Sequence, residues 1–503
     1  MARVVERIND DPPPDLMKSF AAKVRNLDKD LRHVLERQEE KKWRAWVGRV
    51  KARRRKVQRL AKGRVGQGER GEVKDEEKDM YIRKAIRGQR MNELDAVMVE
   101  GKLVYEPEKV KKEVWRHMSK IASTLSPEPP AQPGWLDDCM KRSNAAPQNY
   151  EGLVSKFTNS EMRQALARLD WGVAAGPDGI GGGILRLLAQ EKVDGTEMAT
   201  KEQTDGWVNL LVELAWRIFE VEGRLQLVWD TTTKPLWKKE GSRLMSNIRP
   251  IALQNAIAKL PGAILAQRLT DKLAKSGTMH YAQEAFLKGG RAENVIWTAL
   301  NMWAQHAREK KPYYSVMYDW VKAYDTIPWW ALKVGMQRMS LPEEFQRFVL
   351  GSLSGARTKV RTAYGETEWV VMVRGVKQGD PLAPLLYIIV MDMLHDELHR
   401  GEGTVLEGMK VCSKGYADDV WLGDPTWEGI KAQHGKVLRF CKHFAIGIHT
   451  GKSALIGLEI NRQLIDLTRT LPGQGGEGEI KATHEHQKLL GVWVRPPGNS
   501  ARL

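Results

Sequence analysis

Cysteine is scarce in this sequence, and its scarcity excludes two classes of protein. Cys139, Cys412 and Cys441 are far apart among the 503 residues, and none belongs to a Cys-x-x-Cys pair. A disulfide-stabilised scaffold and a cysteine-based zinc site are therefore excluded. We expect a protein of a reducing compartment, either nuclear or cytoplasmic.

Long hydrophobic runs are also missing. The longest apolar stretch, Pro381 to Leu394, contains Asp392 and is shorter than the roughly 20 residues that cross a bilayer. The N-terminus lacks the apolar core of a signal peptide. The sequence therefore predicts an intracellular protein with no membrane partner.

Acidic residues are too few to balance the basic ones. The chain has 80 Lys and Arg against 63 Asp and Glu, a net charge of +17, and residues 1–70 hold 21 basic against 10 acidic residues, a surplus of 11. A basic surface attracts polyanions, and nucleic acid is a more common partner than an acidic membrane. The basic N-terminal region is thus either a nucleic-acid grip, a nuclear-import signal or a solvated helical face.

The first 156 residues show two kinds of pattern. Apolar residues spaced by three or four predict a helix within a basic arm at 1–62. Residues 63–156 are expected to contain linkers and short helices, with helices near Met80–Val99 and Pro107–Ile121 and a proline-rich linker over Ser126–Gln148. The compact part begins near residue 157, where Thr158 and Glu161 have the spacing of a capping box.

Two adjacent aspartates, Asp418 and Asp419, lie in a short β-prone segment. Like charges repel, and burial of one carboxylate costs several kcal/mol unless a cation compensates it. Mg²⁺ supplies such compensation, because it binds oxygen ligands from one or two carboxylates and from substrate phosphates. Considered alone, the pair is more simply explained as a solvated turn.

A third carboxylate, Asp319, ends the apolar, β-prone run that begins at Val316, and Tyr324 follows five positions later. A two-metal site requires several bridging oxygens, and Asp319 can supply the additional carboxylate. Taken alone, Asp319 is better explained as a strand-end or helix-cap residue.

Glycines and cations between and before these aspartates suggest contacts with a ligand. Gly375 and Gly379 let backbone approach a ligand closely, and Gln378 between them offers both a donor and an acceptor. Lys238 and Arg249 lie on short β-like segments, where they could meet a triphosphate. Isolated cations of this kind are usually only solvated.

Taken together, seven segments in order resemble the successive blocks of a reverse transcriptase of the non-LTR, LINE-like retrotransposon kind. They are Gly176–Ile180, Arg249–Ile251, Gln283–Arg291, Asp319–Asp325, Gly375–Tyr387, Tyr416–Asp419 and Lys488–Val492. The resemblance covers about residues 157–494. Gln283–Phe286 is a loose version of its block, and Thr450–Ser453 only approximates the family's lysine loop.

The resemblance implies an α+β right-hand polymerase whose antiparallel palm sheet is backed by helices, preceded by the basic helical region. Residues 157–312 would form the fingers, and residues 313–495 the palm with a primer-hairpin segment. The core blocks would extend from about residue 220 to 495. We expect the chain to lack a thumb and an endonuclease.

The resemblance also implies residue roles. Asp319, Asp418 and Asp419 would be catalytic and would bind two Mg²⁺ ions, with Mn²⁺ as an alternative ion. Tyr324 would press on the 2′ position of the sugar. The other implied roles are nucleotide binding by Arg249, Lys238, Gln378 and Gly379, and a primer-holding hairpin that includes Leu490, Gly491 and Val492.

The implied function is RNA-directed DNA polymerase, a nucleotidyltransferase whose partners are an RNA template, a DNA primer and dNTPs. One alternative is a catalytically idle, RNA-binding remnant of such a polymerase, because we find no thumb after the hairpin block. A second alternative is a group II intron maturase, whose palm blocks are similar.

Overall fold

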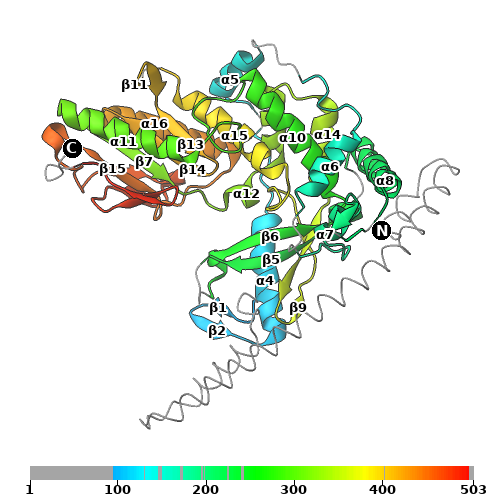
Figure 1. Cartoon of the computed structure of the whole chain (residues 1–503). Coiled ribbons are helices and arrows are strands. Elements are labelled where there is room, and N and C mark those ends of the chain that lie inside the picture. The colour runs from blue at the N-terminus through cyan, green and yellow to red at the C-terminus, as the bar shows by residue number, and fades with distance from the viewer. Residues whose placement is uncertain are drawn as a thin grey trace, which may run out of the picture. The chain divides into compact units, whose positions relative to one another are not determined.

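The computed structural model describes residues 94–497, except for residues 130, 145–149, 170–173, 194–195, 198, 224–225, 239–242 and 402 (Figure 1). The larger of two compact units comprises Leu94–Ala189 and Asp205–Leu503, and it holds every residue with an implied role. The described part of the smaller unit contains the hairpin of β3 (Lys192–Val193) and β4 (Thr196–Glu197) and the start of α8 (Lys201–Glu220). The predicted basic arm at 1–62 lies outside the described residues.

One sheet of the larger unit has five strands in mixed orientation. β5 (Thr231–Trp237) pairs antiparallel with β6 (Ile248–Gln254) and parallel with β8 (Arg357–Thr362). β8 also pairs with β9 (Gly365–Glu366) and β10 (Val370–Val371). β5 and β6 lie before the predicted boundary between residues 312 and 313, and β8, β9 and β10 lie after it. The predicted division into two contiguous ranges therefore cuts through this sheet. We call it the fingers sheet, after the region that the resemblance implies for β5 and β6.

Helix α4 (Pro107–Ala122) covers the fingers sheet. Val110, Val114 and Met118 recur every fourth residue and are buried against a cluster that includes Ile248 and Val360. The predicted helix over Pro107–Ile121 is confirmed, with its proline in the first turn.

The predicted helix over Met80–Val99 is wrong at its C-terminal end. Val97–Val99 forms strand β1, which pairs with β2 (Lys102–Val104), and residues 80–93 lie outside the described part of the chain. The turn between the strands is Glu100-Gly101, and both residues have positive φ angles, 48° and 76°. Two consecutive residues with positive φ form a type I′ turn, whose twist matches that of a two-stranded hairpin.

The predicted linker over Ser126–Gln148 also needs correction, because it contains helix α5 (Gly134–Asn144). The ring of Trp135 lies 6.3 Å from that of Phe440 and 6.2 Å from that of Phe444. Leu136 and Cys139 on the same helix are fully buried. Tertiary packing of these apolar residues therefore outweighs the proline content on which the linker prediction depended.

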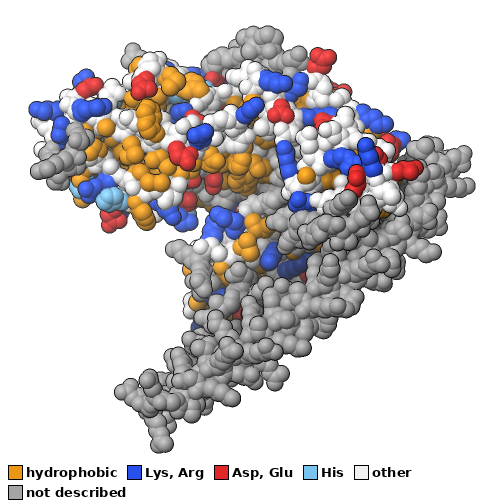
Figure 2. Space-filling model, in the orientation of Figure 1, with side chains coloured by type: hydrophobic (Ala, Val, Ile, Leu, Met, Phe, Trp, Pro, Cys, Tyr) orange, Lys and Arg blue, Asp and Glu red, His pale blue; other side chains and the backbone are white. Residues whose placement is uncertain are grey.

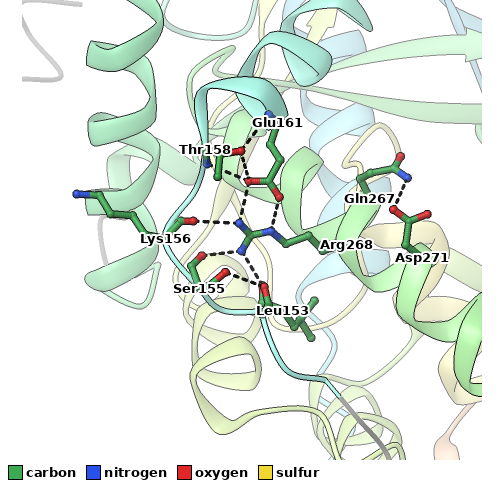
Figure 3. Close-up of polar contacts among 9 residues, drawn as sticks. Leu153, Ser155, Lys156, Thr158, Glu161, Gln267, Arg268 and Asp271 are labelled. Carbon is green, nitrogen blue, oxygen red and sulfur yellow. Dashed lines mark hydrogen bonds and ion pairs between the residues drawn. The ribbon is translucent and has the colours of Figure 1, made fainter.

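The predicted capping box is confirmed at the start of α6 (Asn159–Ala167). The side chains of Thr158 and Glu161 each accept a hydrogen bond from the other residue's backbone N–H. Arg268 of α10 (Lys259–Ser276) donates to both carboxylate oxygens of Glu161, at 2.6 and 2.8 Å. The same guanidinium donates to the carbonyl oxygens of Leu153, Ser155 and Lys156 (Figure 3). One side chain thus attaches the segment before α6 to α10.

Replacing Arg268 with lysine is expected to lower the free energy of unfolding by about 1 to 3 kcal/mol. An ammonium has three donors and lacks the planar fork that serves Glu161 and three carbonyls at once. Urea unfolding followed by tryptophan fluorescence measures the change. Arg217→Lys is the matched control, because Arg217 is half exposed and, among the described residues, forms its ion pairs with Glu213 and Glu220 of its own helix. Equal losses in the two variants would contradict this assignment.

The second sheet has four antiparallel strands in the order β13 (Ser413–Tyr416), β14 (Asp419–Asp424), β7 (Tyr313–Tyr318) and β15 (Ala454–Leu458). We call it the palm sheet. All six residues of β7 are buried, because helices cover both of its faces.

Alternate residues of β7 face these two helical layers. Tyr313 and Met317 pack in one cluster with Trp303 of α11 (Ala292–Glu309). On the other face, the Tyr318 hydroxyl is 2.8 Å from Nδ1 of His434 on α16 (Trp427–Phe444). The alternation is that of a strand buried on both sides.

The apolar run Pro381–Leu394 forms most of α15 (Ala383–Leu398), whose residues are almost all buried. Asp392 within it forms a buried ion pair with Arg338 of α13 (Trp329–Arg338). None of the helices in the described part of the chain combines the length and apolarity that crossing a bilayer requires.

Shorter elements connect these layers. They are the helices α7 (Gly182–Leu187), α9 (Gln226–Trp229), α12 (Ala323–Thr326) and α14 (Glu343–Leu353), the 3₁₀ turns η2 (Met245–Asn247), η3 (Ile460–Arg462) and η4 (Gln474–Gly476), and the strand pairs β11 (Thr404–Leu406) with β12 (Met409–Val411), β16 (Thr470–Pro472) with β17 (Glu479–Lys481), and β18 (Gln487–Leu489) with β19 (Val492–Val494).

Candidate active site

Asp319 and Asp418 are 99 positions apart in the sequence and line the same cleft, which has a volume of about 480 Å³. Asp319 directly follows β7, and Asp418 lies in the turn between β13 and β14. Because Val420 of β14 pairs with Tyr318 of β7, this turn lies beside the end of β7. The palm sheet thus brings the two carboxylates together.

The turn that carries Asp418 has only two residues. Tyr416 pairs with Asp419, so Ala417 and Asp418 connect the strands. Ala417 has a φ of 57°, and a positive φ at the first position is typical of two-residue hairpin turns. A residue other than glycine in this region costs roughly 1 to 2 kcal/mol. The surrounding structure must therefore hold Ala417 in place.

Negative charge is concentrated at this turn. Asp418 and Asp419 are exposed, but the surrounding protein partly desolvates them. This desolvation raises the pKa of Asp418, and the charge of Asp319 raises it further, whereas Arg249 and Lys238 lower it. Desolvation, followed by the charges of Asp418 and Asp319, raises the pKa of Asp419 to about 6. These mutual shifts mean that the three carboxylates lie within electrostatic reach of one another.

These carboxylates do not enclose a cation site by themselves. Within the described ranges, no group of three or more His, Cys, Asp or Glu side chains is arranged to hold a metal ion, and Asp419 does not line the cleft. Mg²⁺ often binds through one or two carboxylates and completes its octahedron with phosphate oxygens and water. The convergence of Asp319 and Asp418 fits an ion whose remaining ligands come from a substrate.

Lys238 and Arg249 line the same cleft from the fingers sheet. Arg249 lies in β6, Lys238 directly follows β5, and the backbone N–H of Lys238 donates to the carbonyl of Asn247 at 2.8 Å. Figure 2 shows Lys and Arg side chains on the fingers-sheet side of this hollow and Asp and Glu side chains on the palm-sheet side. Cations that face carboxylates across a cleft suit a polyphosphate bound with a metal ion.

Tyr324 also lines the cleft, and its ring is held by a second tyrosine. The rings of Tyr324 and the fully buried Tyr387 of α15 lie 4.6 Å apart at an angle of 22°. Burial raises the pKa of Tyr324, and the charge of Asp418 adds to the shift. Tyr324 is therefore a neutral, rigidly placed ring near the carboxylates.

Gln378 and Gly379 line the cleft where the fingers sheet meets the palm. The Gln378 amide nitrogen donates to both carboxylate oxygens of Asp325, each at 3.0 Å, which fixes how the amide is oriented. Burial raises the pKa of Asp325 to about 6. Gly379 has a φ of 111°, and a Cβ there would lie 3.0 Å from the carbonyl oxygen of Ala252. Only glycine fits this backbone path well.

The segment predicted to hold the primer forms a hairpin of β18 and β19, which does not line the cleft. Leu490 and Gly491 have φ angles of 49° and 87°, which is typical of a two-residue turn with both residues left-handed. Leu489 and Val494 are buried in the cluster that also contains Trp303, whereas Val492 is exposed. The structure thus places Leu490, Gly491 and Val492 beside the α11 face of the palm sheet.

The cleft includes residues to which the motifs assign no role. Lys322 and Asp325 line it and belong to the same block as Asp319, so membership of that block was a usable signal. Lys452 of the loosely matching lysine loop lies 3.7 Å from an Asp319 carboxylate oxygen. His449, whose N–H donates to the Asp319 carbonyl at 2.8 Å, had no sequence signal.

Lys377, next to Gln378, predicts a pH dependence of stability. Its buried ammonium donates to the carbonyls of Trp229 and Ser352, and burial lowers its pKa to about 8. An unfolded lysine has a pKa near 10.4. Between pH 8 and about 10.4, Lys377 therefore binds more protons in the unfolded chain than in the folded one. The free energy of unfolding rises with pH in this range.

Lys377→Met is expected to remove this contribution. Between pH 8 and 9.5, the gain in unfolding free energy should be smaller in the variant than in the unmodified chain by roughly 1 to 2 kcal/mol. Urea unfolding at both pH values measures it, with exposed Lys275→Met as the control. Identical pH slopes for the unmodified chain and Lys377→Met would show that Lys377 is not buried in this way.

Comparisons with known proteins identify the family of this region. Residues 237–494 match the family model described as "Reverse transcriptase (RNA-dependent DNA polymerase)". This range covers about half of the chain and includes all of the residues with implied roles.

Several curated proteins are similar to part of this chain. A "Retrovirus-related Pol polyprotein from type-1 retrotransposable element R2" of Popillia japonica is 31% identical over 288 residues, which cover 54% of this chain and 40% of that protein. The corresponding protein of the type-2 element R2DM of Drosophila melanogaster is 26% identical over 312 residues, or 62% of this chain and 27% of that protein. The matched part thus spans well under half the length of either relative.

Proposed function

Because the chain belongs to the reverse transcriptase family, of the non-LTR retrotransposon kind, we propose that its cleft catalyses RNA-directed DNA synthesis. The observation that carries this proposal is the convergence of Asp319 and Asp418, from distant segments, on a cleft that Arg249 and Lys238 line from another sheet. A cleft in which carboxylates and cations lie close together suits the transfer of a nucleotide from a triphosphate.

Asp319 and Asp418, with Asp419 beside them, would hold two Mg²⁺ ions, which when bound promote attack by the primer 3′-hydroxyl and stabilise the departing pyrophosphate. Arg249 and Lys238 bind the triphosphate from the fingers sheet and neutralise part of its charge. Lys452, which pairs with Asp319 at 3.7 Å, balances charge at the carboxylates before substrate binds.

The remaining cleft residues position the nucleotide. The Tyr324 ring, stacked on Tyr387, occupies the space beside the sugar and disfavours a 2′-hydroxyl. The Gln378 amide, oriented by Asp325, and the backbone of Gly379 contact the nucleotide. Fixed groups of this kind lower the entropic cost of aligning the reactants.

The proposed partners are an RNA template, a DNA primer and dNTPs. The hairpin of Leu490, Gly491 and Val492 supports the primer. The fingers and the palm divide near residue 313, except that β8, β9 and β10 belong to the fingers. We propose that the chain acts in the nucleus or the cytoplasm.

Extension of a labelled DNA primer annealed to RNA tests this function. The chain should add the complementary dNTP in the presence of Mg²⁺, and a filter-binding assay should detect binding of the same duplex. Binding without any addition of nucleotide, even at high protein concentration, would contradict the proposal and favour an idle, RNA-binding protein.

A further inference from the structure

The palm sheet has an additional neighbour beside its edge strand β13, namely the extended residues 282–284. Gln283 forms a parallel bridge with Gly415. The N–H of Gly415 donates to the carbonyl of Ala282 at 2.8 Å, and the N–H of Glu284 donates to the carbonyl of Gly415 at 2.9 Å. This segment therefore continues the sheet beyond the strand that leads into the turn of Asp418.

The side chain of Gln283 extends this support to the turn itself. It is only 3% exposed, and its amide oxygen accepts hydrogen bonds from the N–H groups of Ala417, at 3.2 Å, and Ala285, at 3.0 Å. Ala417 is the residue with left-handed backbone directly before Asp418. A buried acceptor thus contacts the strained residue of the turn.

Two further contacts of Lys414 join the hairpin to this segment and to the residue before it, and α15 packs closely against the hairpin. The Lys414 ammonium lies 2.6 Å from a Glu284 carboxylate oxygen, and both side chains are nearly buried. The same ammonium donates to the carbonyl of Tyr281 at 2.8 Å. On the inner side of β13, a Cβ at Gly415 would lie only 2.6 Å from Nε2 of His395 on α15. The strand is therefore confined between α15 and the segment that contains Gln283.

We propose that Gln283 is a positioning residue for nucleotide transfer. Its amide oxygen holds Ala417 in the left-handed conformation and thereby fixes the Asp418 carboxylate relative to Asp319. This role rests on the proposed function of the cleft. Loss of the hydrogen bond should weaken the use of Mg²⁺ and slow the chemical step, because the carboxylate is misplaced. It should leave dNTP affinity nearly unchanged, since Gln283 does not line the cleft.

Gln283→Met tests the proposal, because methionine has a similar length but cannot accept these hydrogen bonds well. Hydrogen–deuterium exchange of the peptide 413–419 should become at least about tenfold faster at the Ala417 amide. For supporting residues of a metal site, losses of about 10- to 100-fold are typical, and we expect such a fall in kcat. KM for dNTP should change less than about threefold, and half-saturation by Mg²⁺ should require several-fold more ion. Gln283→Glu keeps an acceptor oxygen and should restore most of the exchange protection.

Gln346→Met is the matched control for general loss of stability. Gln346 lies on α14, outside the cleft, and its amide nitrogen donates to the carbonyl of Leu341 at 2.7 Å. This variant should change neither exchange at 413–419 nor the Mg²⁺ dependence. Unchanged exchange in Gln283→Met, or faster exchange with unchanged kcat, would overturn the proposal. Absence of incorporation by the unmodified chain would instead contradict the proposed function, while the exchange comparison would still show whether Gln283 holds the turn.

Discussion

Asp418→Asn is expected to lower the rate of nucleotide incorporation by about 10³-fold or more. The substitution keeps the size of the side chain but removes a negative charge that a divalent ion needs. Duplex binding should persist, because most of the attraction to the nucleic acid comes from phosphate contacts elsewhere. Single-turnover primer extension at saturating dNTP measures the change.

Two further variants make this prediction specific to the cleft. The double variant Asp319→Asn/Asp418→Asn should be scarcely slower than either single variant, because groups that act as a unit are not additive. Asp424→Asn at the far end of β14 should have little effect, since asparagine can still accept the hydrogen bonds from Thr426. A similar loss in Asp424→Asn would mean that any change in this strand, rather than the carboxylate, stops the reaction.

Tyr324→Val is expected to reduce the discrimination between dNTPs and rNTPs by about 10²-fold. Valine is too short to fill the space of the ring that stacks on Tyr387, so a 2′-hydroxyl no longer meets a steric barrier. The measurement is kcat/KM for matched dNTP and rNTP pairs on one RNA template.

Tyr324→Phe separates the effect of the ring from that of the hydroxyl. It should retain both the stacking and the discrimination. If Tyr324→Phe loses discrimination as fully as Tyr324→Val, the hydroxyl and not the bulk of the ring would be responsible. If neither variant changes discrimination, Tyr324 does not contact the sugar.

The elements that position the carboxylates were predictable from local sequence. Asp319 follows the apolar run Val316–Tyr318, and Asp418 lies within the short segment Lys414–Leu422, whose tyrosine, valine and tryptophan favour strands, which is how strand ends and hairpin turns appear in a sequence. Their convergence was not visible in either segment alone. It came from the resemblance of ordered blocks, and the register of β14 on β7 supplies its geometric basis.

The errors and omissions have a common physical cause, which is tertiary contact. Proline content around residues 126–148 predicted a linker, yet Trp135 finds partners on α16, about 300 positions away. The pairing of β8 with β5 similarly joins segments that a linear division separates. The bond between Gln378 and Asp325 depends on side chains 53 residues apart, which no local pattern encodes.

Template-directed addition of a single nucleotide tests the central claim most directly. The unmodified chain and Asp418→Asn are each mixed with a DNA primer on an RNA template, Mg²⁺ and one dNTP at a time. We predict that the unmodified chain adds only the dNTP complementary to the RNA base, and that Asp418→Asn adds none in the same time. Equal incorporation by the two proteins would contradict the assignment of this cleft as the polymerase active site.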